Sequence, residues 1–160
     1  MKLWLAAVAA AALAVAVHAD DIGKKVNDPV SNKPVTVAKD TPSVAVNGTR
    51  LYFADAKSRE AFLKTPEAFL KTPLECPVRG IKGKADKTKR IVVNDELVYF
   101  CCAGCSMGFQ KEPNNYVSKL IDPVSTKEFN LASDSPKVQY KGSWYFFESD
   151  ENKATFEKDP

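Results

Sequence analysis

An internal repeat of 47 residues constrains the fold of this chain more than any other feature of its sequence. Similar residues recur three times at this spacing: an aromatic pair, a phenylalanine and a proline. They are Tyr52-Phe53, Tyr99-Phe100 and Phe146-Phe147, then Phe62, Phe109 and Phe156, then Pro66, Pro113 and Pro160. Agreement at so many positions indicates three copies of one structural unit. We assign the copies to residues 20–71, 72–120 and 121–160, preceded by a separate segment, residues 1–19.

Each copy contains the same order of local signals. An Asp-Pro-Val or Cys-Pro-Val start predicts a knuckle-like turn, and two short alternating segments then predict a β-hairpin. The hairpin turns are Asn47-Gly48, Asn94-Asp95 and Lys141-Gly142. A short helix follows, with Asp55 as the predicted N-cap in the first copy and Ser149 in the third. The predicted strands are 43–46 with 49–53, 90–93 with 96–100, and 137–140 with 143–147.

The expected fold class is α+β, with knuckle, hairpin and helix in each copy. A unit of about 45 residues is near the size below which a domain needs a metal, disulfides or a partner. The first and third copies contain no cysteine, so we expect them to complete their cores against neighbouring copies. The short connections 71–74 and 120–121 favour one compact body.

Residues 1–19 have the pattern of a secretory signal peptide. Lys2 precedes an uncharged run from Leu3 to Val17, and Val17-His18-Ala19 has the small-x-small form of a cleavage site. The run is shorter than the roughly 20 residues that a spanning helix needs. We therefore expect a periplasmic or secreted protein with no membrane span after cleavage.

The composition of the remaining 141 residues excludes several functions. Of the 23 basic residues, only Lys2 lies in the signal segment, which leaves 22 against 20 acidic residues. With this near-neutral balance, no basic stripe predicts nucleic-acid binding. The single histidine, His18, is also in that segment, which excludes Ser-His or Cys-His catalysis, His-ligated haem and mixed Cys/His zinc sites. We expect no enzymatic activity, and four cysteines remain as the groups with evident chemistry.

The four cysteines all lie in the middle copy, as Cys76, Cys101, Cys102 and Cys105. A hairpin returns the chain to its starting end, so the residue after its second strand comes back beside the knuckle. Cys101 and Cys105 are one helical turn apart and can face the same ion. Cys102 is adjacent to Cys101, and we expect it to be a fourth ligand or an exchange partner. Thiolates are soft ligands, so the preferred ion is Zn(II) or Cu(I).

The middle copy resembles a YHS domain of the kind grouped with TRASH modules, a family linked to sensing, trafficking and resistance of heavy metals. The resemblance is carried by Cys76-Pro77-Val78-Arg79-Gly80, by Tyr99-Phe100-Cys101-Cys102-Ala103-Gly104-Cys105, and by Phe109, Pro113 and Tyr116. It implies a treble-clef-like unit whose metal ligands are Cys76, Cys101 and Cys105. The first and third copies are similar only in the scaffold, with Asp28 and Asp122 in place of Cys76. At the other two ligand positions the first copy has Ala54 and Ser58, and the third has Glu148 and Asn152.

The function expected from these observations is heavy-metal binding outside the cytoplasm, as a scavenger, chaperone or sensor component. One alternative is a non-catalytic protein-interaction module with two disulfides, since an even number of cysteines is typical of exported chains. Another is a thiol oxidoreductase that uses Cys102 and Cys105. The basic segment from Lys82 to Arg90 is either a solvated loop or a contact for an acidic protein partner.

Overall fold

The computed structural model describes residues 19–160, so the predicted signal peptide lies outside the described residues apart from Ala19. The described helices are α1 (Ala56–Lys64), α2 (Ala103–Lys111) and α3 (Asp150–Lys158). The strands are β1 (Lys25–Asn27), β2 (Pro34–Thr36), β3 (Ser43–Val46), β4 (Thr49–Tyr52), β5 (Leu74–Glu75), β6 (Lys82–Gly83), β7 (Arg90–Val93), β8 (Glu96–Tyr99), β9 (Lys119–Ile121), β10 (Glu128–Asn130), β11 (Lys137–Tyr140) and β12 (Ser143–Phe146). This confirms the α+β class. The treble-clef description and the copy boundaries stay predictions.

The three predicted hairpins are confirmed as β3–β4, β7–β8 and β11–β12. Their turns need positive φ at both central residues, and Asn47 and Gly48 have φ of 45° and 75°. The two predicted N-caps are also confirmed. A side-chain oxygen of Asp55 accepts from the amide of Ser58, and that of Ser149 accepts from the amide of Asn152.

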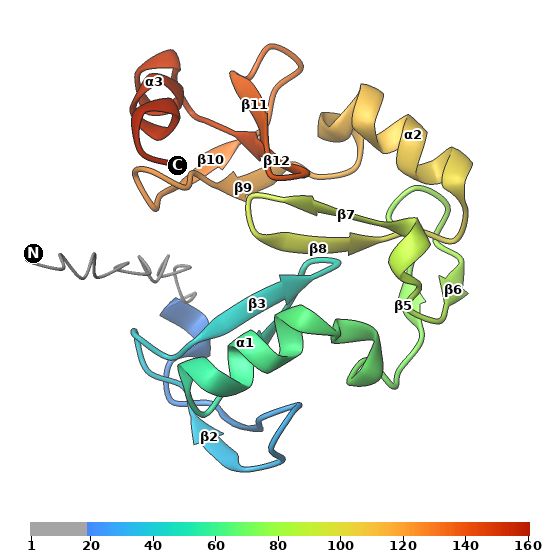
Figure 1. The fold of residues 1–160 in the computed structure, drawn as a ribbon, viewed down its shortest axis with the longest axis vertical. Coiled ribbons are helices and arrows are strands. Elements are labelled where there is room, and N and C mark those ends of the chain that lie inside the picture. Colours follow the sequence, from blue (N-terminus) through green and yellow to red (C-terminus); the bar gives the residue numbers. More distant parts are fainter. Residues whose placement is uncertain (1–18) are drawn as a thin grey trace, which may run out of the picture.

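The hairpins lie side by side in one six-stranded sheet of the described residues, in the order β11-β12-β7-β8-β3-β4 (Figure 1). Pairing is antiparallel within each hairpin. Neighbouring hairpins meet through a single parallel residue pair each, Val46 with Leu97 and Val93 with Trp144. A shorter antiparallel pair precedes each hairpin: β1–β2, β5–β6 and β9–β10. Each short pair encloses one Asp/Cys-Pro-Val knuckle.

The asparagine of the first hairpin turn joins the first copy to the second. The Asn47 side-chain amide donates to the carbonyl oxygens of Glu75, at 2.7 Å, and Tyr99, at 3.0 Å. Its Oδ1 accepts from the amide of Tyr99 at 2.7 Å. One side chain thus replaces several ladder hydrogen bonds at a seam where few strand residues pair.

The asparagine of the second turn joins the second copy to the third in the same way. The side-chain amide of Asn94 donates to the carbonyl oxygens of Ile121 and Phe146, and the Oδ1 of Asn94 accepts from the backbone amide of Phe146. The third turn has Lys141 at this position, which has no side-chain acceptor. The hairpin that this turn closes contains β11, which is an edge strand of the sheet.

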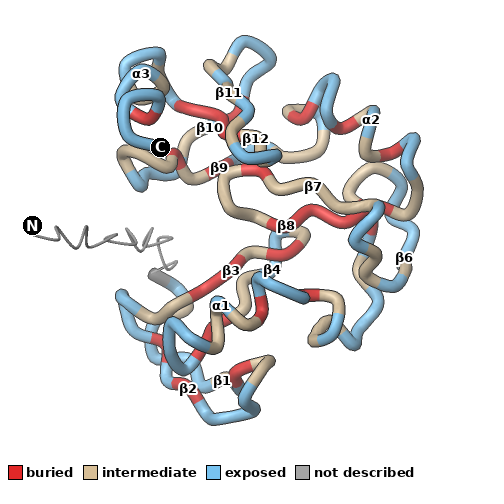
Figure 2. Tube along the Cα trace, in the orientation of Figure 1, coloured by how far each residue is buried: buried red, intermediate tan, exposed pale blue. Residues whose placement is uncertain are grey.

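The hydrophobic core is shared between copies, as the small unit size predicts. Leu97 and Tyr99 of β8 pack into a cluster with Phe53 and Phe62 of the first copy. Val98 of β8 and Phe100, which follows the strand, belong to a second cluster, which also contains Phe146 of the third copy. Figure 2 shows β8 buried along most of its length. The six aromatic residues of the repeated pairs are all buried in the core.

None of the helices in residues 19–160 is both long enough and apolar enough to cross a bilayer.

We predict that Asn94→Lys destabilises the protein by about 2–3 kcal/mol in urea unfolding, because it leaves backbone groups of Ile121 and Phe146 without partners at the seam. Lysine is the matched replacement, since Lys141 adopts the same turn conformation with a φ of 48°. The control is Lys141→Asn, expected to change stability by less than about 0.5 kcal/mol. Equal effects of the two substitutions would show that the seam does not depend on this side chain.

Candidate metal centre

The knuckle places Cys76 directly after β5, with its side chain buried at 2% exposure. The turn is closed by two backbone hydrogen bonds, from the amide of Cys76 to the carbonyl of Ile81 and from the amide of Gly80 to the carbonyl of Cys76. Gly80 has a φ of 65°, which a glycine adopts without strain. The turn thus holds the Cys76 sulfur in a fixed position.

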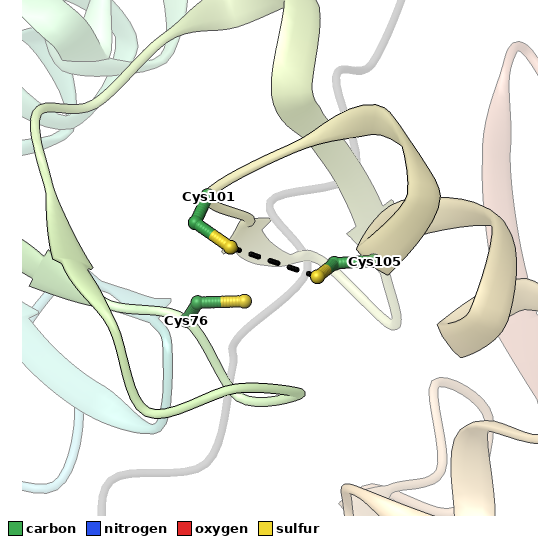
Figure 3. Close-up of side chains that lie close together, drawn as sticks. All are labelled: Cys76, Cys101 and Cys105. Carbon is green, nitrogen blue, oxygen red and sulfur yellow. Dashed lines mark hydrogen bonds between the residues drawn. The ribbon is translucent and has the colours of Figure 1, made fainter.

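The end of the hairpin brings the other two sulfurs to the same point. Cys101 follows β8 by two residues, and Cys105 lies in the first turn of α2. Their sulfurs are 3.6 Å apart (Figure 3). The three Sγ atoms of Cys76, Cys101 and Cys105 all lie within 4.8 Å of one another. This is the convergence that the hairpin argument predicts.

These separations suit a thiolate-bound ion. Zn–S bonds of about 2.3 Å in a tetrahedral site place sulfurs about 3.8 Å apart. The observed cluster therefore needs only small side-chain adjustments to take an ion. Cys76 and Cys105 are buried at 2% and 4% exposure, whereas Cys101 is partly exposed, so an ion would reach the cluster from the side of Cys101.

Cys102 lies at the margin of this cluster. It occupies the N-cap position of α2 without a capping hydrogen bond of normal geometry, and its sulfur is 3.3 Å from that of Cys105. The backbone amide of Cys105 approaches the sulfur, and with the neighbouring thiols it lowers the pKa of Cys102 to about 7. Cys102 is thus positioned to be a fourth or exchanging ligand.

The protonation of the cluster is uneven. Burial raises the pKa of Cys76, but the backbone amides of Cys101, Val78 and Arg79 donate to its sulfur and leave the pKa below its usual value. Burial and the neighbouring thiols raise the pKa of Cys105 to about 12. Of the two buried thiols, Cys76 therefore ionises more readily than Cys105, and a bound cation would release the thiol protons that remain.

The third copy explains why Cys76 is surrounded by amides. Asp122 lies at the equivalent knuckle position and is fully buried. Its Oδ1 accepts from the amides of Val124 and Ser125, and its Oδ2 accepts from the amide of Glu148 at 2.8 Å and the side-chain amide of Asn152 at 3.1 Å. Residues 122, 148 and 152 correspond to Cys76, Cys101 and Cys105. The carboxylate thus links the positions that the three sulfurs occupy in the middle copy.

The first copy has the same arrangement around Asp28. Its Oδ1 accepts from the amides of Val30 and Ser31, and its Oδ2 accepts from the amide of Ala54 at 2.8 Å. Sequence reasoning treated Asp28 and Asp122 only as residues that remove a ligand, and so missed their structural role. The available signal was the acidic residue at a tight turn, where a short carboxylate accepts nearby backbone amides.

Met107 lies on the surface of α2 with 59% exposure.

Comparison with known proteins adds no assignment to this geometry. No protein-family model matches the chain, and no curated protein or solved structure matches it either. The case for the metal centre rests on the residues described above.

We predict that stability falls steeply below about pH 4 because of Asp28 and Asp122. Burial raises the pKa of each carboxyl, but the donated hydrogen bonds outweigh burial, so each folded-state pKa is below the usual value. Such groups stabilise the fold above the unfolded-state pKa of about 3.9, and this contribution is lost as the pH falls through the folded-state pKa.

The measurement is the urea midpoint of the reduced, metal-free protein from pH 7 to pH 2. Asp122→Asn should be less stable at pH 7 and should show a weaker dependence on pH below 5. Asp134→Asn, which changes an exposed aspartate of the same copy, is the control and should follow the wild type. If the urea midpoint of Asp122→Asn depends on pH below 5 as strongly as that of the wild type, the assignment is contradicted.

Proposed function

We propose that this protein binds a thiophilic metal ion, Zn(II) or Cu(I), outside the cytoplasm, with Cys76, Cys101 and Cys105 as ligands. The observation that carries the proposal is the convergence of three sulfurs from two distant segments within 4.8 Å. A scavenger, a metal chaperone and a component of a metal sensor all need such a site. The ion is the cargo of the protein, and no catalytic step is part of the proposal.

The comparison between copies supports an ion in the middle copy. In the third copy a buried anion, Asp122, ties the knuckle to the helix through hydrogen bonds. The middle copy has sulfur at all three equivalent positions. Thiols are weak hydrogen-bond donors and acceptors, so they replace this network poorly. Three thiolates around one cation restore a strong link between the same segments.

Cys102 is proposed as the ligand that receives and hands on the ion. Its sulfur contacts Cys105 and is partly exposed, so it can bind an entering ion before the buried sulfurs do. The alternative, permanent fourth ligation, uses the same contact. The two roles differ in whether removal of Cys102 changes the rate of metal exchange or the number of thiolates bound.

The remaining parts of the proposal come from the sequence. The signal-peptide pattern supports export, and the resemblance of residues 76–116 to YHS domains supports a treble-clef-like unit with a role in heavy-metal handling. The first and third copies, which lack the thiols, are proposed to stabilise and position the middle copy.

We predict one Zn(II) or Cu(I) ion per chain in the reduced, metal-loaded protein, measured by native mass spectrometry. The decisive variant is Cys76→Asp/Cys105→Asn, which reproduces Asp122 and Asn152 of the third copy. We expect it to bind no ion yet unfold in urea at a midpoint close to that of the metal-free wild type, since the carboxylate network replaces the sulfurs. Cys102→Ser is the matched control and should keep one ion per chain.

Two outcomes would overturn this assignment. One is a wild-type protein that retains neither ion. The other is unchanged stoichiometry in the double variant. Counting free thiols in protein from the exported compartment separates the disulfide alternative, because two disulfides leave no free thiol and block the site.

A graft into the first copy tests the scaffold argument. We predict that Asp28→Cys/Ala54→Cys/Ser58→Cys adds a second ion per chain, because the three positions correspond to Cys76, Cys101 and Cys105. The single variant Asp28→Cys should add none, since one thiolate does not hold an ion. A folded triple variant that still binds one ion would show that the backbone of the middle copy has a feature that the first copy lacks.

A further inference from the structure

A groove of about 580 Å³ opens beside the cysteine cluster, and Cys101 lies in its wall. Most of its lining comes from β6 and the segment between β6 and β7, and Ile81, Phe100 and Glu67 also line it. We call it the lysine groove, because four lysines line it: Lys82, Lys84, Lys87 and Lys89. A volume of this size is in the range of small-molecule sites.

The two carboxylates of the lysine groove already have partners. Glu67 accepts from Arg90 at 2.8 Å and from the Tyr99 hydroxyl at 2.9 Å. Asp86 pairs with Lys89 at 3.0 Å and accepts from Thr88. Among the described residues, no such ion pair is present at the exposed residues Lys82, Lys84 and Lys87. The groove therefore has three positive charges available to an anion.

This charge is specific to the copy that has the thiols. Residues 82–89 carry four lysines and one aspartate, a net charge of +3. The equivalent segment of the first copy, residues 34–42, has a net charge of 0, and that of the third, residues 128–136, has −2. A hydrophilic loop needed only for solubility would not require this bias. The positive charge thus accompanies the metal centre.

The charge also determines what can reach Cys101. A free metal cation is repelled by three lysines at the entrance, whereas a chelate whose carboxylates outweigh the charge of the metal is attracted. The exposed Ile81, together with Ala85 and Phe100, adds apolar surface to the lining. That surface suits an anion with a carbon skeleton better than inorganic phosphate.

We propose that the lysine groove binds small polycarboxylate anions and holds a metal ion that they chelate beside Cys101. This rests on the proposed metal-binding function for the delivery of the ion, but the binding of the anion does not. Lys82, Lys84 and Lys87 contact the carboxylates, and the ion then exchanges carboxylate oxygen for thiolate sulfur. Thiolates are the softer ligands, so a thiophilic ion moves toward the cluster.

The first arm of the test titrates citrate, without metal, into the reduced metal-free protein at constant ionic strength, followed by amide shifts in ¹H–¹⁵N NMR spectra. We expect saturable shifts in residues 81–89. Lys82→Gln/Lys84→Gln/Lys87→Gln should weaken citrate binding about tenfold or more, since each exposed charge pair contributes up to about a factor of five. The control Lys33→Gln/Lys39→Gln/Lys57→Gln makes the same charge change in the first copy and should bind citrate as the wild type does.

Three results of this arm would overturn the proposal: no saturable binding, equal loss in both triple variants, or equally tight binding of inorganic phosphate. The first two show that the groove is not an anion site, and the third shows a site for any anion. None of them depends on whether the protein binds metal.

The second arm measures the rate of Zn(II) transfer to the cysteines by stopped flow, from the anionic nitrilotriacetate chelate and from a cationic triamine chelate. In the variant Lys82→Gln/Lys84→Gln/Lys87→Gln, we expect the rate of transfer from the anionic chelate to fall about tenfold at low salt. The rate of transfer from the cationic chelate should not fall. If the wild-type protein takes Zn(II) from neither chelate, the metal-binding function is overturned. The citrate titration still decides whether the groove binds anions. Equal rates in the wild type and the groove variant, with metal bound, would overturn delivery through the groove.

Discussion

A buried acceptor at the knuckle is the interaction on which each copy depends. In the first and third copies it is the carboxylate of Asp28 or Asp122. Each carboxylate accepts hydrogen bonds from backbone amides of its own turn and from a backbone amide 26 residues later in the chain. In the middle copy the equivalent backbone amides, those of Val78, Arg79 and Cys101, surround the sulfur of Cys76. A unit with so small a core needs this link between the turn and the start of the helix. The choice between carboxylate and thiolate then decides whether a copy is only structural or also able to bind an ion.

The second constraint acts between copies. Adjacent hairpins share a single parallel residue pair at each seam, so the sheet would be weak there without the turn asparagines. Each asparagine needs a positive φ to sit in the turn, and it has both a donor and an acceptor to complete the neighbouring strand. This explains why one residue type serves both the local turn and the contact between copies. Residues of both flanking copies share hydrophobic clusters with β8, in which three of the four residues are buried.

The features that sequence analysis predicted well are those fixed by short segments. Hairpin turns with Asn-Gly, and N-caps such as Asp55 and Ser149, depend on residues within four positions of one another, and all of them are confirmed. The convergence of Cys76, Cys101 and Cys105 was predictable because a hairpin returns the chain to its starting end. The hydrogen bonds of Asp122 within its own turn were predictable in the same way as the N-caps, but those from Glu148 and Asn152 were not, because these residues lie 26 and 30 positions later in the chain. The contacts of Asn47 across the seam were likewise hidden, since nothing local distinguishes them from an ordinary turn residue.

One side chain of the cysteine-free first copy bonds to both segments that carry the cysteine cluster. Asn47 donates to the carbonyl oxygens of Glu75 and Tyr99, and these residues lie one position before Cys76 and two before Cys101. A single amide group therefore sets the separation of the two backbone segments that supply the first two ligands. Asn94 makes the same bridge in the third copy, between Ile121 and Phe146, which flank the Asp122 network. The repeat thus gives the second and third copies a preceding copy whose turn asparagine bridges the two segments that meet at the knuckle. For the middle copy, the separation of these segments determines how closely the sulfurs approach one another.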